Sequence, residues 1–291
     1  MTDYLKNEYD LDDPSIVSVL DECYYWSAPF GIRLLDTVRY KNNIRALDVG
    51  FGLGFPLIEL AMRLGSSSRV YGIDPWHAGM ERARWKTEIA EIKNIELVRG
   101  LAESLPFDDS FFDLIVSNNG INNVQDLSKT FAECSRVAKN DAQFVFTYNL
   151  EETFIEFYNA YRIVLRTLGL QEYEKNIDVH IHHKRPPLSE MKAKVEEAGF
   201  HVVKVHHDRF DYRFADGTAL LNHFFIKIAF LPLWKEIIPP EKTEEVFRSI
   251  ENAINREAAA SLKGKDSRCG FSIRVPFATF DCEKNRKEKE S

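Results

Sequence analysis

One glycine-rich segment of the chain has a spacing that could bind a nucleoside cofactor. Asp48 follows a short apolar run and precedes three glycines at alternate positions, Gly50, Gly52 and Gly54. Such glycines let the main chain turn sharply and approach a ligand without an intervening side chain. A second acid, Asp74, ends the next apolar run, where its carboxylate could accept hydrogen bonds from two ribose hydroxyls. We therefore expect a loop that holds its ligand mainly through the main chain.

The main alternative is a dinucleotide-binding loop, whose spacing is G-x-G-x-x-G. Counted from Gly50, its third glycine would fall at Phe55, and counted from Gly52 it would fall at Leu57. Neither position holds glycine, so an NAD(P)-dependent oxidoreductase is the weaker interpretation. A non-catalytic protein that binds the cofactor without turnover stays open as well, because intact loop residues argue only for binding.

Short apolar runs alternate with amphipathic segments in the first half of the chain. Runs that are apolar on both faces indicate buried strands, and their alternation with helices favours a parallel sheet covered on both sides. Ligands bind such sheets outside the carboxyl ends of the strands, which is where the glycine loop would lie. Strands are expected at residues 45–50, 69–74, 95–99, 112–117 and 142–148, and helices at 55–64, 78–92 and 127–138.

The second half of the chain continues this pattern with longer insertions. A helix is expected at residues 190–198, with Ser189 as its N-cap and Gly199 at its end. The remaining expected elements are strands at 201–214 and 271–280 and two helical insertions over one end of the sheet, at 153–168 and 217–263, the second broken at Pro239-Pro240.

These elements predict an α/β fold with a Rossmann-like, seven-stranded and mostly parallel sheet, helices on both faces, and C-terminal helical insertions that form a cap. A single catalytic domain would comprise an N-terminal helical lid at 1–43, a cofactor-binding core at 44–150, and the segment 151–291, which completes the sheet and adds the cap. A chain of 291 residues with 44% hydrophobic content is large enough for such a domain.

The spacing G-x-G-x-G with an aspartate two residues ahead resembles the first motif of the class I S-adenosylmethionine-dependent methyltransferases. The segment from Gly100 to Ser117, GLAESLPFDDSFFDLIVS, looks like the adenine-side loop and fourth strand of the ubiquinone/menaquinone-biosynthesis (methyltransferase type 11) group. The resemblance covers about residues 44–148 well and the rest in outline. It implies S-adenosylmethionine as the cofactor and in-line transfer of its methyl group to a small molecule.

This cofactor would engage the loop and its flanking residues. Asp48 can face its cationic amino group or sulfonium, and the loop N–H groups can hold its carboxylate. The resemblance places the main chain at Ala102-Glu103 against the adenine edge. An aromatic stretch at 23–30 could close over the cofactor as part of the lid. The expected cofactor-binding residues are Asp48, Gly50, Phe51, Gly52, Gly54, Asp74, Pro75, Ala102, Glu103, Asn118, Asn119, Tyr25 and Trp26.

Two departures from the family pattern affect the site. Leu101 stands where many relatives have an aspartate that accepts the adenine amino proton, so adenine recognition must rest on backbone atoms, on apolar packing or on Glu103. Asn122-Asn123 stands where many relatives carry histidine, so no histidine base is supplied there. The candidates for polar contacts to the acceptor are Asn119, Asn122 and His223.

The acceptor is expected to be a small molecule with an apolar part. A net charge of −7 gives no electrostatic attraction to nucleic acid or to an anionic membrane. After the fourth strand the chain reads SNNG instead of the Asn/Asp-Pro-Pro-Tyr/Phe segment of enzymes that methylate nucleic-acid bases. Methyl transfer from a sulfonium needs positioned reactants and a dry site rather than a dedicated nucleophile.

No metal site, membrane span or secretory leader is expected. His180, His182 and His183 could share a cation on an extended segment, but no acid or cysteine completes that site and Lys184-Arg185 would repel the ion. The apolar stretch 224–234 is too short and too interrupted to cross a bilayer. Four scattered cysteines without a CxxC pair favour a cytoplasmic protein with free thiols, namely Cys23, Cys134, Cys269 and Cys282.

Overall fold

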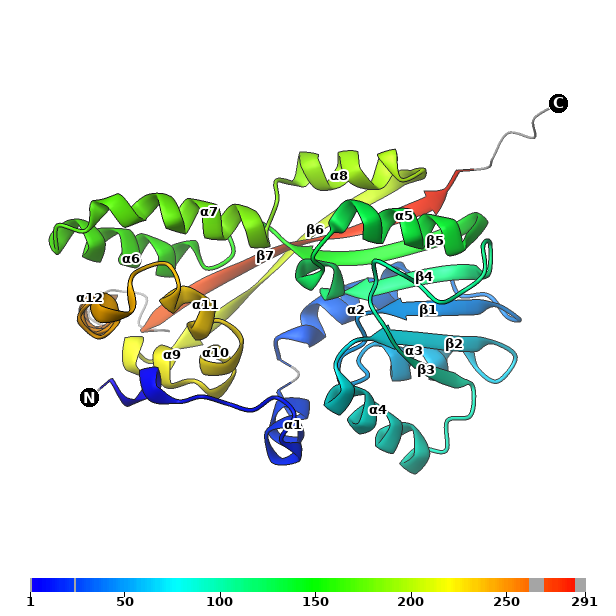
Figure 1. Ribbon diagram of the computed structural model, residues 1–291, viewed down its shortest axis with the longest axis horizontal. Coiled ribbons are helices and arrows are strands. Elements are labelled where there is room, and N and C mark those ends of the chain that lie inside the picture. The colour runs from blue at the N-terminus through cyan, green and yellow to red at the C-terminus, as the bar shows by residue number, and fades with distance from the viewer. Residues whose placement is uncertain (1, 24, 262–269, 286–291) are drawn as a thin grey trace. The chain divides into compact units, whose positions relative to one another are not determined.

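The computed structural model describes residues 2–23, 25–261 and 270–285. Their strands form one seven-stranded sheet in the order β3-β2-β1-β4-β5-β7-β6 (Figure 1). The pairs β3–β2, β2–β1, β1–β4 and β4–β5 are parallel, and β5–β7 is antiparallel. The predicted Rossmann-like fold class is therefore confirmed. The strands are β1 Arg45–Val49, β2 Arg69–Asp74, β3 Ile95–Arg99, β4 Phe112–Asn118, β5 Ala138–Asn149, β6 Phe200–Phe214 and β7 Phe271–Lys284.

The chain divides into two compact units, each built from several segments. We call Leu11–Asn149, Pro187–Asp208 and Phe277–Ser291 the sheet unit, and Met1–Asp10, Leu150–Pro186 and Arg209–Pro276 the helical unit. The sheet unit contains α1 Pro14–Asp21, α2 Ser27–Thr37, α3 Leu57–Leu64, α4 His77–Ile89, η2 Gly120–Asn123, α5 Leu127–Val137 and α8 Leu188–Glu197. The helical unit contains η1 Asp3–Lys6, α6 Ile155–Thr167, η3 Gln171–Tyr173, α7 Glu174–Lys184, α9 Gly217–Asn222, α10 Phe224–Ala229, α11 Leu231–Lys235, η4 Pro240–Lys242 and α12 Thr243–Ser261.

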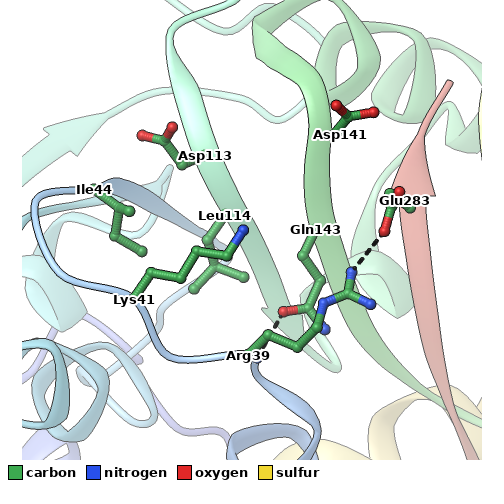
Figure 2. A pocket seen from close by; sticks show the side chains of 8 residues that line it. All are labelled: Arg39, Lys41, Ile44, Asp113, Leu114, Asp141, Gln143 and Glu283. Carbon is green, nitrogen blue, oxygen red and sulfur yellow. Dashed lines mark hydrogen bonds and ion pairs between the residues drawn. The ribbon is translucent and has the colours of Figure 1, made fainter. Parts of the chain in front are cut away.

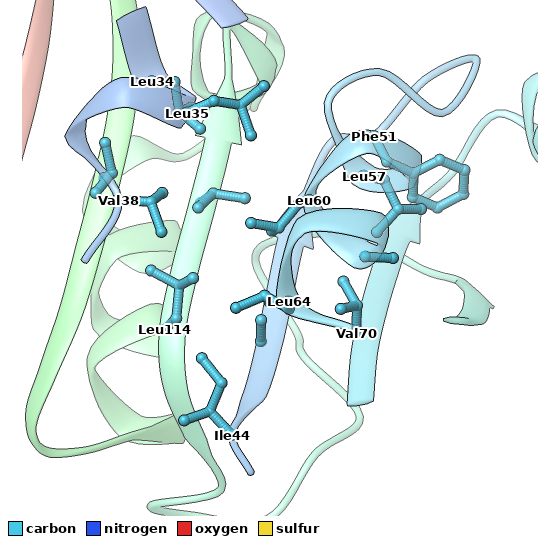
Figure 3. Packing of buried hydrophobic residues seen from close by; sticks show 14 of the residues in the cluster. Leu34, Leu35, Val38, Ile44, Phe51, Leu57, Leu60, Leu64, Val70 and Leu114 are labelled. Carbon is cyan, nitrogen blue, oxygen red and sulfur yellow. The ribbon is translucent and has the colours of Figure 1, made fainter. Parts of the chain in front are cut away.

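Alternate residues of a strand point to opposite faces of the sheet. The central strands are apolar on both faces, and helices therefore cover both. Phe144 and Phe146 of β5 contact Phe131 of α5, with ring centroids 6.1 and 5.4 Å apart. Val145, between them, joins a buried cluster on the other face. That cluster holds Leu34, Leu35 and Val38 from α2 and the residue after it, Leu57, Leu60 and Leu64 from α3, and Val70 and Leu114 from the strands (Figure 3).

Aromatic side chains dominate the core of the helical unit. The Trp234 ring of α11 stacks on Phe157 of α6 at a centroid distance of 3.9 Å. The Tyr161 hydroxyl donates a hydrogen bond of 3.2 Å to the main-chain oxygen of Trp234. α12 packs against both α6 and α9 and buries Phe247 and Ile250 among other apolar residues. This unit thus has a hydrophobic core of its own.

Two sequence-based predictions about local structure are wrong. The segment with His180, His182 and His183 is not extended but forms the end of α7, whose buried positions Ile177 and Ile181 are one turn apart. Ser189 is not the N-cap of α8, because the helix begins at Leu188, two residues earlier than predicted, and Pro187 occupies the cap position.

Other features bear on the predictions about thiols and membranes. Cys23, Cys134 and Cys282 are free thiols, and Cys269 lies outside the described residues. Within the described part of the chain, no helix combines the length and the apolar character needed to span a membrane.

Candidate cofactor and acceptor site

The glycine loop joins β1 to the region before α3 and is held by short main-chain hydrogen bonds. Gly50 N–H donates to Ile73 O and Gly54 N–H donates to Phe51 O, both at 2.8 Å. Gly50 has a φ of +78°, and a Cβ atom on it would lie 2.8 Å from the Cα of Gly120. The main chain at Gly50 can therefore lie against the main chain at Gly120 only because neither residue has a side chain.

Gly52 is the loop position that faces open space. Its φ is +52°, and a Cβ atom built on it would meet nothing within 4 Å. Its N–H donates a hydrogen bond of 2.8 Å to Asp74 Oδ2. The space next to Gly52 can hold a group that approaches the bare main chain, as an amino-acid or nucleoside moiety does. Phe51 offers only its main chain there, because its side chain is buried in the core beside Gly72.

Asp74 ends β2 with its carboxylate fixed by two main-chain donors. Besides the bond from Gly52, Asp74 Oδ1 accepts a hydrogen bond of 2.8 Å from Trp76 N–H. The residue is 7% exposed, and burial raises the pKa of its carboxyl group while these two N–H donors lower it. A carboxylate oxygen can accept more than one hydrogen bond, so Asp74 retains acceptor capacity for vicinal hydroxyls.

Asp48 is a fully buried acid on β1. Neither of its oxygens accepts a hydrogen bond of ordinary geometry from the described residues, although the N–H of Leu57 lies near enough to lower its pKa in part. Burial and the nearby Asp74 carboxylate raise the pKa of Asp48 to about 8. A buried carboxylate without a partner is unfavourable, which makes Asp48 a natural contact for a cationic group. The residues of the loop therefore fit a cofactor that carries an amino group and a ribose.

The start of α2 lies against the carboxyl end of β4. The Asn118 amide Nδ2 donates a hydrogen bond of 3.2 Å to the main-chain oxygen of Ser27. Gly31, one turn further, packs so closely on the Phe55 ring that a Cβ atom there would lie 2.2 Å from it. Tyr25 is 41% exposed, and Trp26 is the N-cap of α2. Both aromatic residues predicted for the lid thus stand at the end of α2 that reaches this site.

Three further residues predicted to contact the cofactor lie past the ends of β2 and β3. Glu103 Oε1 accepts a hydrogen bond of 2.7 Å from Gln125 N–H, so this carboxylate fixes the segment before α5. Ala102 is half-buried in the turn before it, and Pro75 is exposed. Sequence reasoning missed the adjoining Trp76, whose ring packs on Gly79 so closely that a Cβ atom on that glycine would lie 2.5 Å from it.

Asparagine and threonine side chains form a connected cluster at the carboxyl ends of β4 and β5. Thr147 Oγ1 donates to Asn118 Oδ1 at 3.1 Å and accepts from Asn119 N–H at 3.0 Å. Asn122 Nδ2 donates to Asn119 Oδ1 at 3.2 Å and to Asn149 Oδ1 at 3.0 Å. Asn119 Nδ2 and Asn122 Oδ1 are buried without hydrogen-bond partners among the described residues. We call Asn118, Asn119, Asn122, Thr147 and Asn149 the amide cluster.

The remaining predicted residue, His223, belongs to the helical unit. It connects α9 to α10 and contacts the Tyr212 and Phe214 rings at centroid distances of 6.3 and 5.5 Å. Burial lowers the pKa of its imidazole, so the neutral form is favoured. The amide cluster, by contrast, brings Asn119 and Asn122 together within the sheet unit.

A charged cavity opens at the opposite edge of the sheet, near the amino ends of β1 and β4. Its volume is about 290 Å³. Arg39 is tied to two other lining residues: its Nη2 donates to Glu283 at 3.2 Å, and its main-chain N–H donates to Gln143 Oε1 at 2.8 Å. The lining residues are Arg39, Lys41, Ile44, Asp113, Leu114, Asp141, Gln143 and Glu283 (Figure 2).

Comparison with known proteins identifies relatives of this chain. A family described as a methyltransferase domain matches residues 47–146. The demethylmenaquinone methyltransferase of Bacillus mycoides strain KBAB4 is 32% identical over 130 residues, which make up 45% of this chain and 54% of that enzyme, so the match spans about half of that relative. The same enzyme of Staphylococcus aureus strain JH9 is 30% identical over 200 residues, 65% of this chain and 79% of that enzyme.

A solved structure shows the same fold. It is a protein of Bacillus halodurans C-125, for which methyltransferase activity has been suggested, with a TM-score of 0.57 and 22% identity. The superposition covers 88% of this chain and 99% of that protein.

The fold and the family match together define a class I S-adenosylmethionine-dependent methyltransferase. None of these relatives favours an oxidoreductase or a non-catalytic binding protein. More narrowly, the chain belongs to the methyltransferase family of the ubiquinone/menaquinone-biosynthesis type.

Proposed function

We propose that this protein moves the methyl group of S-adenosylmethionine to a small, partly apolar acceptor, and that this acceptor is an aromatic quinol or a molecule of similar shape. The cofactor supplies a methyl group that its sulfonium has already activated. The observation that carries the proposal is the arrangement of Asp48, Gly52 and Asp74: a buried acid with no hydrogen-bond partner in the described part of the chain, a bare stretch of main chain and a second acid held in place. The likeness to demethylmenaquinone methyltransferases supports the choice of acceptor.

Each part of the loop would hold a different part of the cofactor. Asp48 would bind the amino group, the N–H groups from Gly50 to Gly54 its carboxylate, and Asp74 with Pro75 the ribose. The turn at Ala102-Glu103 would border the adenine, and Tyr25 and Trp26 would close over it. Exclusion of water strengthens each of these charge-assisted contacts.

The amide cluster would orient the acceptor. Among the described residues, Asn119 Nδ2 is a donor and Asn122 Oδ1 an acceptor without a partner, and a hydroxyl group can satisfy both because it donates and accepts. Unpaired buried amide atoms penalise a ligand that lacks such a group.

The proposal is tested by the release of S-adenosylhomocysteine. The full chain is incubated with S-adenosylmethionine and a set of acceptors that contains a dihydroxynaphthalene quinol, its non-hydroxylated parent, a glycine derivative and an RNA oligonucleotide. We expect turnover with the quinol alone. Turnover with the glycine derivative or the RNA, and none with the quinol, would contradict the acceptor assignment.

The Asp74→Ala variant is expected to bind S-adenosylhomocysteine about 1.5–3 kcal/mol more weakly, because a charged acceptor of hydrogen bonds is lost. Isothermal titration calorimetry measures the difference. Asp113→Ala serves as the control, since Asp113 pairs with Lys139 in the same unit but lines the cavity at the opposite edge. Equal affinities of the Asp74 variant and the wild type would refute the ribose assignment.

The Asn122→Ala variant is expected to lower turnover roughly tenfold to a hundredfold, because the amide that links Asn119 to Asn149 is lost and the acceptor is no longer oriented. Affinity for S-adenosylhomocysteine should not change. The exposed neighbour Asn123, replaced by alanine, is the matched control. Full turnover in the Asn122 variant would remove the amide cluster from the acceptor site.

A further inference from the structure

The basic end of α7 has a feature that the cofactor site does not account for. The last turn holds His182, His183 and Lys184, and Arg185 follows as the C-cap. Arg185 is 5% exposed. Arginine is rarely buried so deeply unless a carboxylate or another anion accompanies it. The burial of Arg185 therefore calls for an anion that accompanies its guanidinium.

Aromatic rings surround the Arg185 guanidinium instead of carboxylates. Its Cζ lies 5.7 Å from the centroid of Phe154 and 5.9 Å from that of Tyr158. Its Nη1 donates one long hydrogen bond, 3.5 Å, to the Tyr158 hydroxyl, which also accepts from Trp234 Nε1 at 3.2 Å. Over residues 2–23, 25–261 and 270–285, no carboxylate forms an ion pair with Arg185.

These contacts leave most of the guanidinium without a protein partner in the described residues, although none of its nitrogens is both fully buried and unsatisfied, so the free side of the fork can be reached from solvent. A guanidinium has several N–H donors in a planar fork, and the described residues satisfy one of them. Ring faces and the carbonyl end of α7 attract a cation, but each contributes less than a paired anion does. An oxyanion from outside the chain would satisfy the fork with two parallel hydrogen bonds.

The backbone of Phe154, whose ring lies beside the Arg185 guanidinium, has a strained conformation. Phe154, the N-cap of α6, has a φ of +66°, which is unusual for a bulky residue. Its N–H donates to Arg274 O at 3.0 Å, and its ring is fully buried, 4.7 Å from Phe230 and 5.7 Å from Trp234. Packing thus keeps the Phe154 ring beside the guanidinium despite the conformational strain of its backbone. Such backbone strain is concentrated at ligand sites.

The titratable groups of the last turn of α7 and His180 carry no negative charge, and the acid nearest to them on this helix, Asp178, pairs with Arg162. The His180 ring lies 5.9 Å from Tyr158, and its pKa is lowered to about 4, first by burial and then by the positive charges of Arg185 and Lys184. His180 is therefore neutral near pH 7 and can donate an N–H bond. The positive charge comes from Arg185 and the half-buried Lys184.

We propose that Arg185 anchors a binding site in the helical unit for a small organic oxyanion, a carboxylate or a phosphate monoester. The guanidinium fork binds two oxygens of the anion, and Lys184 and His180 lie at the same end of α7 as further donors. The low-polarity rings of Phe154 and Tyr158 strengthen the ion pair by excluding water. The site goes beyond the proposed methyl transfer and does not depend on it.

Calorimetric titration of the full chain with benzoate and with phenyl phosphate tests the proposal, with benzamide as the uncharged analogue. We expect one of the two anions to bind at least about tenfold more tightly than benzamide, and the Arg185→Met variant to lose this preference. Arg166→Gln is the matched control, because Arg166 is an exposed arginine of the same unit that pairs with Glu174. Which anion binds distinguishes a carboxylate ligand from a phosphate ester.

Thermal unfolding without any anion separates ligand binding from a structural role. Removal of a buried charge that lacks a counter-ion should leave the midpoint of Arg185→Met unchanged or raise it, whereas a structural arginine would lower it. Binding of S-adenosylhomocysteine by the same samples reports that the sheet unit is intact. If the methionine variant fails to fold, Arg185→Lys keeps the charge without the fork and should bind the anion several-fold more weakly. Equal binding of benzamide and both anions, or undiminished anion binding by the folded variant, would overturn the proposal.

Discussion

Replacement of Gly52 by valine is expected to abolish the binding of S-adenosylhomocysteine while the sheet stays folded. The valine side chain would fill the space that a Cβ atom on Gly52 enters without contact within 4 Å. The φ of +52° adds strain, because a β-branched residue disfavours the left-handed region. We expect affinity to fall by roughly a hundredfold or more, and calorimetry with the purified variant measures it.

Gly65→Val is the matched control for this variant. Gly65 has a φ of +69° and equally open space at its Cβ position, but it follows α3 at the end away from the loop. This variant should lose stability through the same backbone strain and still bind the ligand. If both valine variants bound with wild-type affinity, the loop could not be the cofactor site.

The loop could be predicted from the sequence because its determinants are local. A strand, three spaced glycines and a helix follow one another within a few residues, and Asp74 lies at the end of the next strand. Local patterns of this kind fix both the turn and the position of the acid. The predicted bounds of β2 and β3 are confirmed without change.

The amide cluster could be predicted only in part, because the register of two strands creates it. Asn118 and Asn119 stand out in the sequence, but Thr147 is some thirty positions away and meets them only because β4 and β5 pair with Asn118 opposite Thr147. Asn149 follows on the same strand. No short motif reports such a pairing, since strand register depends on the packing of both faces.

The sequence pattern wrongly indicated an extended segment at the end of α7, because charged residues and histidines outnumber the apolar residues that mark the helical period. Only Ile177 and Ile181 are buried there, four positions apart, which is the minimum for one helical face. Basic residues in a last turn are typical of helix ends, and His182 to Lys184 carry that signal. Burial of Arg185 could not be foreseen, because it depends on Phe154 and Tyr158 from another part of the chain.

The Asp48→Asn variant is expected to be more stable than the wild type near pH 8 when no cofactor is bound. The pKa of Asp48 is raised from 3.8 to about 8 in the folded protein, so the folded state holds its proton more tightly than the unfolded state does. This contribution to stability is complete below about pH 4 and is lost as the pH rises through about 8. Asparagine does not titrate, so the difference between the two proteins should grow over that range to the order of a few kcal/mol.

Urea unfolding of both proteins at several values from about pH 5 to about pH 8 measures this difference, and groups that titrate in both proteins cancel. Asp113→Asn is the control for the loss of one carboxyl group, because Asp113 is partly exposed and pairs with Lys139. Affinity for S-adenosylhomocysteine should decrease in Asp48→Asn, since the amino group of the ligand would lose its ionic partner. A stabilised variant with weaker binding would show that the buried acid is kept for the ligand at the expense of the free protein. Parallel pH profiles for wild type and variant would instead mean that Asp48 is ionised and satisfied before any cofactor arrives.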